Sequence, residues 1–126
     1  AMAWCARRGP WSATFCLGVS STLACQLLNN QPMMVLFAKV LMHPSFDAGE
    51  PERLAAYGAA IIGSNLGANL TLIGALAGPM WVRVGAQEGV HICSWDFFKT
   101  MLHVTPVVLS VALLVLCVEL SVLGPA

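Results

Sequence analysis

The sequence predicts an all-α membrane protein, and three features of its composition and charge pattern support that prediction. Hydrophobic residues make up 58% of the 126 residues and charged residues only 10%, whereas soluble domains carry roughly 25% charged residues. Mean hydropathy is +0.78. The charges are clustered, which leaves uncharged runs of 30 residues (Gly9–Ala38), 29 residues (Leu54–Val82) and 19 residues (between Lys99 and Glu119). A helix needs about 20 apolar residues to cross the hydrocarbon core, so these runs supply membrane segments.

The same composition argues against several other classes of protein. Net charge is zero, so nothing favours a nucleic-acid partner. Five cysteines occur without CxxC spacing, which is typical of reduced, buried thiols, although a disulfide or metal site is the alternative. The three histidines, His43, His91 and His103, share no ligand spacing. Because no nucleophile–base pair is present either, we expect no enzyme activity, no catalytic residues, no metal site and no cofactor.

We expect one membrane domain, residues 1–126, that is the C-terminal fragment of a longer transporter. The reason is length, since 126 residues provide only three or four membrane passes. The expected segments are a re-entrant helical hairpin (11–42), a discontinuous transmembrane helix (52–84), an interfacial segment (91–99) and a terminal transmembrane helix (100–123).

The hairpin is predicted from a polar tip between two apolar arms. Trp11–Leu28 is apolar with interspersed small residues, which allow close helix packing. It ends at Asn29-Asn30-Gln31-Pro32, where proline disfavours continued helix. The second arm, Met33–Met42, would rise only about 15 Å, roughly half a bilayer. The alternative is a capping turn in an ordinary loop between two membrane helices.

The discontinuous helix is predicted from a polar, glycine-rich stretch inside an uncharged run. His43–Arg53 is a water-exposed connection, after which Leu54–Ile62 forms a half-helix. Gly63–Thr71 is the expected break, and Leu72–Val84 resumes the helix. Non-helical backbone at membrane depth occurs only where it is buried in protein or lines a cavity, and transporters use such breaks for substrate. The alternative is a small-residue packing interface on one continuous helix.

The last segments are simpler. His91–Lys99 mixes aromatic and charged residues, as an interfacial amphipathic segment does. Met101–Val118 is nearly all valine and leucine and predicts a lipid-facing helix with Pro106 near its start.

The two polar interruptions suggest one binding site. Each would place neutral amides near the bilayer midplane, where an unpaired amide costs several kcal/mol. If they face one another, they can satisfy each other and still bind a ligand. Glycines Gly63, Gly67 and Gly74 would permit unusual backbone angles and close approach. Neither interruption contains a charge, which suits a small neutral hydroxylated solute or a weakly charged ion.

Three motifs in order give the chain a family resemblance. They are the tip Asn29–Pro32 followed by Met33, the stretch Gly63–Trp81, and Ser94–Lys99 before a terminal apolar helix. Over about Leu27 to Leu116 the chain resembles the C-terminal repeat of arsenical pump membrane proteins, the arsenite permeases of the ion-transporter superfamily.

This resemblance implies a secondary transporter that exports arsenite or antimonite by alternating access. In that family, two inverted repeats each supply a re-entrant hairpin and a broken helix that meet around the substrate, so the resemblance implies that this chain forms half of an inverted-repeat transporter. It implies a substrate or ion site made of Asn29, Asn30, Gln31 and Pro32 at the hairpin tip and of Ser64, Asn65, Gly67, Asn69, Thr71 and Gly74 in the broken helix. The implied partners are arsenite, antimonite or another small ion, the lipid bilayer, the missing N-terminal repeat and an ATPase subunit. The implied location is multi-pass in a plasma or inner membrane.

Two departures from the family pattern keep other functions open. Gln31 stands where the family often has leucine, and Ala68-Asn69 stands where it often has Pro-Lys. A lysine there would favour anions, so its absence bears on the substrate. The alternatives are a sodium/proton antiporter, an organic-anion carrier for dicarboxylates or citrate, and a non-transporting truncated membrane subunit.

Overall fold

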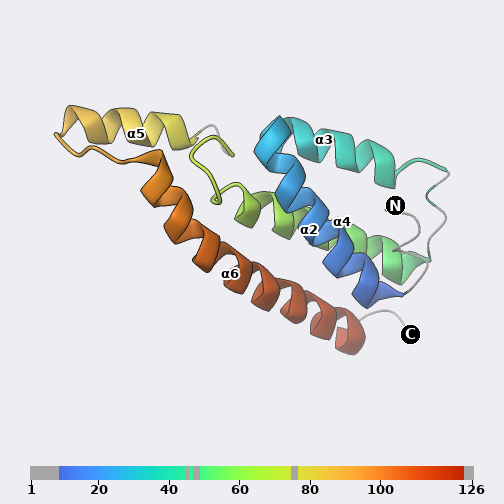
Figure 1. Ribbon diagram of the computed structural model, residues 1–126. Coiled ribbons are helices and arrows are strands. Elements are labelled where there is room, and N and C mark those ends of the chain that lie inside the picture. The colour runs from blue at the N-terminus through green and yellow to red at the C-terminus, as the bar shows by residue number, and fades with distance from the viewer. Residues whose placement is uncertain (1–8, 45, 47–48, 75–76, 124–126) are drawn as a thin grey trace.

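The computed structural model describes residues 9–44, 46, 49–74 and 77–123, and these ranges are all-helical apart from their connections (Figure 1). The helices are α2 (Pro10–Leu28), α3 (Asn30–Leu41), α4 (Glu50–Gly67), α5 (Ala77–Gln87) and α6 (Ser94–Leu123). Helix α4 packs against α2, α3 and α6, whereas α5 makes no close backbone contact with the other helices in the described ranges. The core therefore lies around α4.

Small residues bring α2 and α4 into close contact. The buried face of α4 repeats a small residue at every fourth position: Ala55, Ala59, Gly63 and Gly67. A Cβ atom on Gly63 would collide with the Ser21 hydroxyl and the Gly18 carbonyl of α2. The two helices can approach this closely only because those positions lack bulk, as at interfaces between membrane helices.

A hydroxyl group joins the same two helices. The Thr22 Oγ1 atom lies 2.9 Å from the Gly18 carbonyl oxygen of its own helix and 3.0 Å from the Gly63 carbonyl oxygen of α4. This side chain is buried, so its hydroxyl needs a partner, and both acceptors are backbone oxygens. The contact fixes how α2 and α4 are aligned along their length.

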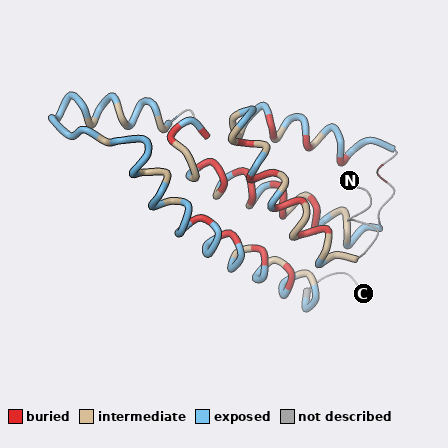
Figure 2. Tube along the Cα trace, viewed as in Figure 1, coloured by how far each residue is buried: buried red, intermediate tan, exposed pale blue. Residues whose placement is uncertain are grey.

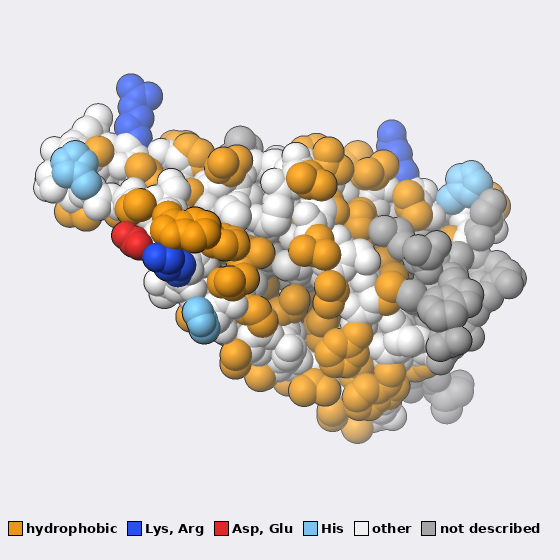
Figure 3. All heavy atoms as spheres, in the orientation of Figure 1, with side chains coloured by type: hydrophobic (Ala, Val, Ile, Leu, Met, Phe, Trp, Pro, Cys, Tyr) orange, Lys and Arg blue, Asp and Glu red, His pale blue; other side chains and the backbone are white. Residues whose placement is uncertain are grey.

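Helix α6 packs on this pair through one narrow stripe. Its buried residues recur at every fourth position: Thr105, Leu109, Leu113 and Cys117. The rest of α6 exposes large apolar side chains, and Figure 2 shows the buried stripe on one side of the helix. Hydrophobic side chains cover much of the face in Figure 3, with few charges. Helices α2 and α6 are long and apolar enough to cross a bilayer, judged by length and composition.

The structure places the expected break later in the chain than Gly63. Helix α4 continues to Gly67, and the described non-helical stretch is residues 68–74, called the break from here on. Gly63 stays helical, and its lack of a side chain lets α4 pack closely against Gly18 and Ser21 of α2. Residues 75–76 lie outside the described ranges. Helix α6 begins at Ser94, so most of the expected interfacial segment is its first turns.

The packing of α6 gives a first prediction. Leu113 is 1% exposed and lies against Gly18, where a Cβ atom would be 2.7 Å from a Leu113 methyl carbon. We expect Leu113→Ala to cost about 2 kcal/mol, the low end of the range for buried leucines, because lipid already solvates apolar groups. Thermal unfolding of the complete gene product that contains this chain, purified in detergent, measures it. Val115→Ala, on the exposed side of the same helix, should leave the melting temperature nearly unchanged.

Candidate functional site

A polar cavity lies between the start of α3 and the last turns of α4. Its volume is about 330 Å³, and it is lined by Asn30, Gln31, Met34, Ser64 and Asn65. The two sides come from segments that are at least 30 residues apart in the sequence. Among the residues that the structure describes, no charged residue lines the cavity. Four of the ten site residues predicted from the sequence therefore line one cavity of neutral amides and a hydroxyl.

The polar groups in this cavity are only partly engaged. Asn65 donates its side-chain N–H to the Ile61 carbonyl at 2.9 Å, and Ser64 donates its hydroxyl to the same oxygen at 3.1 Å. Within the described ranges, the side-chain amides of Asn30 and Gln31 have no hydrogen-bond partner. The cavity thus offers the side-chain amides of Asn30 and Gln31 and the side-chain oxygen (Oδ1) of Asn65 to a polar solute.

The first turn of α3 contributes a positive electrostatic potential to this cavity. Asn29 is the N-cap residue, yet its side chain makes no capping hydrogen bond. The first backbone N–H groups of a helix point outward without an intrahelical partner and give that end a partial positive charge. Pro32, in the same turn, has no N–H to offer, which fits a first-turn position. An oxygen-rich or negatively charged group would be favoured here.

Asn29 forms the turn between α2 and α3. Its φ is 64°, which is uncommon for a residue other than glycine, and its ψ of 157° lies outside the left-handed helical region. Its Oδ1 atom is buried and accepts no hydrogen bond from the described residues. A buried acceptor without a hydrogen bond lowers stability by about 1–3 kcal/mol, so a hydrogen-bond donor is expected to bind this oxygen. Asn29 does not line the cavity, and its predicted place in the site stays a prediction.

The end of α4 is capped by its own following residues. The backbone carbonyl of Asn65 accepts a hydrogen bond from the Asn69 side chain at 3.1 Å, and the backbone carbonyl of Leu66 accepts one from the Asn69 backbone N–H at 3.2 Å. The Gly67 carbonyl accepts from the Leu70 N–H at 2.9 Å. Carbonyl groups at a helix end need such partners. Asn69 therefore terminates the helix and does not reach the polar cavity.

Gln26 on α2 also holds the end of α4, and sequence reasoning missed it. Its Nε2 atom donates to the Gly67 carbonyl at 2.6 Å, and its Oε1 atom accepts from the Thr71 hydroxyl at 2.8 Å. The signal was available, because an amide inside a 30-residue uncharged run needs a buried partner. What could not be read from the sequence was which carbonyl and hydroxyl it meets.

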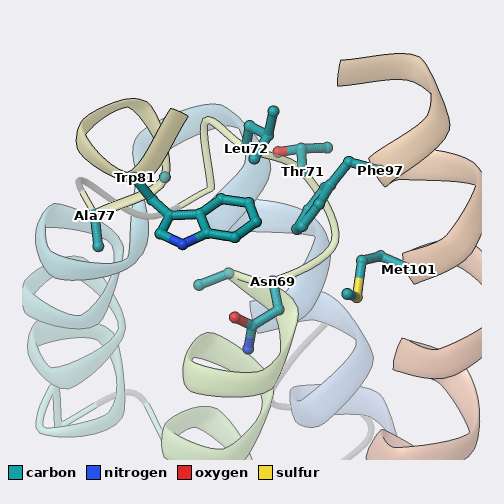
Figure 4. Close-up of a pocket in the computed structure, with 9 residues that line it drawn as sticks. Asn69, Thr71, Leu72, Ala77, Trp81, Phe97 and Met101 are labelled. Carbon is teal, nitrogen blue, oxygen red and sulfur yellow. The ribbon is translucent and has the colours of Figure 1, made fainter. Parts of the chain in front are cut away.

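A second cavity lies on the other side of the break and is mainly apolar. Its volume is about 440 Å³, and Asn69 and Thr71 line it together with Trp81, Phe97 and Met101. The Trp81 and Phe97 rings lie side by side in Figure 4. Their centroids are 6.4 Å apart and their planes are tilted by 56°. Such a surface suits an apolar group better than a polar solute. Asn69 and Thr71 thus line a different cavity from Asn30 and Asn65.

The predicted glycines serve close packing. A Cβ atom on Gly67 would lie 2.7 Å from the Thr22 Cα atom, and one on Gly74 would lie 2.7 Å from the Ala68 carbonyl oxygen. None of Gly63, Gly67 and Gly74 has a positive φ, so the unusual backbone angles expected for them are not found. Their small size, not their conformational freedom, is what the structure uses.

Comparisons with known proteins give a consistent picture. The sequence model of the arsenical pump membrane protein family matches residues 2–120. An arsenical pump membrane protein of Escherichia coli is 34% identical over 117 residues, which are 93% of this chain and 27% of that protein. Proteins with the same description from Shigella flexneri and Yersinia enterocolitica are each 33% identical, over 92% and 93% of this chain and 27% of their own length. The chain thus spans about a quarter of the length of these relatives. No solved structure matches it.

Proposed function

Because the chain belongs to the arsenical pump membrane protein family, we propose that its complete gene product exports arsenite or antimonite by alternating access. The chain is part of an integral membrane protein of the arsenite permease type. In our proposal, the polar cavity between α3 and α4 is its share of the substrate site.

The single observation that carries this proposal is the chemistry of the cavity. Asn30 and Gln31 line it with Ser64 and Asn65, and no charged side chain of the described residues lines it. Arsenite is mainly neutral near pH 7 and presents hydroxyl groups, which both donate and accept hydrogen bonds. Side-chain amides also do both, so they match such a solute without the desolvation cost of a buried charge.

We further propose that α2 and α3 form a re-entrant hairpin and that α4, the break and α5 form a discontinuous helix. Helix α3 has 12 residues and rises about 18 Å, well short of a hydrocarbon core of about 30 Å. A polar tip that ends such a short arm would lie inside the bilayer. This geometry supports a site near the midplane, where transporters of this kind bind substrate.

In our proposal, the remainder of the site and the energy source come from parts of the complete gene product outside this chain. In our proposal, a second repeat supplies the opposite wall of the cavity and covers the exposed amides of α3. Export of a neutral solute against its gradient also requires coupling to a proton, an ion or an ATPase subunit.

Arsenite export tests the proposal directly. Cells that lack their own exporter would express the complete gene product, either unchanged or as Asn30→Ala or Asn65→Ala. Each substitution removes one hydrogen-bonding partner, so we expect about a tenfold lower export rate at low arsenite, which corresponds to about 1.4 kcal/mol. Gln87→Ala removes an exposed amide at the end of α5 and should have no effect. Unchanged export by both site variants at normal membrane abundance would contradict the proposed site.

The field at the start of α3 favours a second candidate, an organic-anion carrier. An uncapped helix N-terminus is a place where carboxylates bind. Sodium-dependent uptake of citrate or a dicarboxylate by the complete gene product, without arsenite export, would replace the first proposal by this one.

A further inference from the structure

The Gln26 amide is the centre of a directional chain of hydrogen bonds that links α2 to the break. Its Nε2 atom donates to the Gly67 carbonyl at 2.6 Å and lies 3.1 Å from the Thr22 carbonyl. Its Oε1 atom accepts from the Thr71 hydroxyl at 2.8 Å. The Thr71 oxygen in turn accepts from the Gly74 backbone N–H at 3.1 Å. Every donor in this chain meets an acceptor, so the side chains of Gln26 and Thr71 are well matched.

This chain of bonds has a position that matters for the polar cavity. Gln26 lies four residues before Asn30, one helical turn from the hairpin tip. Gly67 lies just after Ser64 and Asn65, which form the other wall of the cavity. The amide therefore ties the hairpin to the end of α4 close to the point where the two cavity walls separate.

The chemistry of the contact requires a neutral amide. Only a group that donates and accepts at once can satisfy both the Gly67 carbonyl and the Thr71 hydroxyl. Leucine in place of Gln26 would do neither, and glutamate could accept from Thr71 but would turn a negative oxygen toward the Gly67 carbonyl. Valine in place of Thr71 keeps the shape of the side chain and removes the hydroxyl.

We propose that Gln26 is a positioning residue that holds the break after α4 against the hairpin and thereby sets the spacing of the two walls of the substrate cavity. This inference rests on the function proposed above. With the Gln26–Thr71 contact formed, the end of α4 and the hairpin tip move as one body. When it breaks, residues 68–74 rearrange independently and the walls lose their spacing.

Hydrogen–deuterium exchange of the complete gene product tests the contact without any transport assay. In Gln26→Leu and in Thr71→Val, the peptide containing residues 68–74 should exchange about fivefold to tenfold faster, since each variant removes a buried hydrogen bond. Peptides from α6 should be unchanged. Thr71→Ser keeps the hydroxyl and should restore slow exchange. Thr100→Val, an exposed threonine on α6, is the matched control. Unchanged exchange of residues 68–74 in both variants would overturn the contact.

Transport kinetics test the positioning role separately. For Gln26→Leu and Thr71→Val we expect the KM for arsenite to rise about fivefold. For Thr71→Ser we expect a KM close to that of the unchanged protein. Faster exchange of residues 68–74 with an unchanged KM would mean that the contact is merely structural and would overturn the positioning role. If the unchanged protein exports no arsenite, the proposed function fails and the positioning role with it, while the exchange data still decide whether the contact exists.

Discussion

Gly63→Ala is expected to separate α2 from α4 and to lower the stability of the protein by about 3 kcal/mol or more. A methyl group at this position would meet the Ser21 hydroxyl and the backbone carbonyl of Gly18. The carbonyl belongs to a helix and cannot rotate away, so the helices must move apart and lose their small-residue contact. Forcing extra volume into a well-packed contact typically costs about 1–3 kcal/mol, and a clash with backbone lies at the upper end.

The sign of this effect distinguishes packing from helix propensity. Alanine normally stabilises a helix relative to glycine by roughly 0.5–1 kcal/mol, so propensity alone predicts a gain. Gly85→Ala in α5 is the control, because a Cβ atom there meets nothing closer than 3.5 Å. We expect Gly85→Ala to leave the melting temperature of the detergent-purified gene product unchanged or slightly raised. A neutral Gly63→Ala would mean that α2 and α4 do not pack as the structure has them.

The small residues from Gly63 onward explain why the break was predicted too early. Glycine and serine in an uncharged run fit both a broken helix and a close helix–helix contact, and both alternatives were open from the sequence. The structure divides the stretch between them: Gly63 and Gly67 pack on α2, and the helix ends only where the Asn69 side chain caps it. Which small residue faces a partner depends on where α2 lies, and local composition does not contain that information.

The candidate site was predictable in outline for a related reason. The motif around Asn29–Pro32 and the motif around Ser64 and Asn65 each marked a polar interruption, and the structure brings Asn30 and Asn65 to one cavity. Asn65 and Asn69 would share a face if the helix continued. Because α4 ends at Gly67, Asn69 instead lines the apolar cavity with Trp81. A boundary shift of a few residues is therefore enough to place a predicted site residue in a different cavity.

A carboxylate at position 30 is expected to have the largest effect on function while leaving the fold intact. Asn30 is the first residue of α3, and its side chain lines the polar cavity. Aspartate is almost the same size, is ionised at pH 7, and is favoured in the first turn of a helix by about 0.3–1 kcal/mol. Desolvation of the carboxylate inside the bilayer opposes this gain, so we expect Asn30→Asp to fold with a melting temperature equal to or slightly below that of the unchanged complete gene product.

The same charge should strongly reduce export of an oxygen-rich solute. Arsenite would meet a carboxylate that cannot donate a hydrogen bond and that is available to the N–H groups of α3 in its place. Losing the donor and filling the helix end would together remove about 2–3 kcal/mol of binding, so the export rate at low arsenite should fall roughly 30-fold to 150-fold. Membrane abundance, measured on the same cells, separates this loss from poor folding.

The direction of the Asn30→Asp effect also reports the charge of the solute. A carboxylate substrate would suffer repulsion as well, so a citrate or dicarboxylate carrier should lose more activity than an arsenite exporter. A cation such as sodium would instead bind more tightly beside the new carboxylate, and activity at low sodium would rise. Gln87→Glu makes the same change from amide to carboxylate at the exposed end of α5, outside the cavity, and controls for a general effect of charge. If Asn30→Asp and Gln87→Glu behaved alike, the cavity between α3 and α4 would not be where the solute binds.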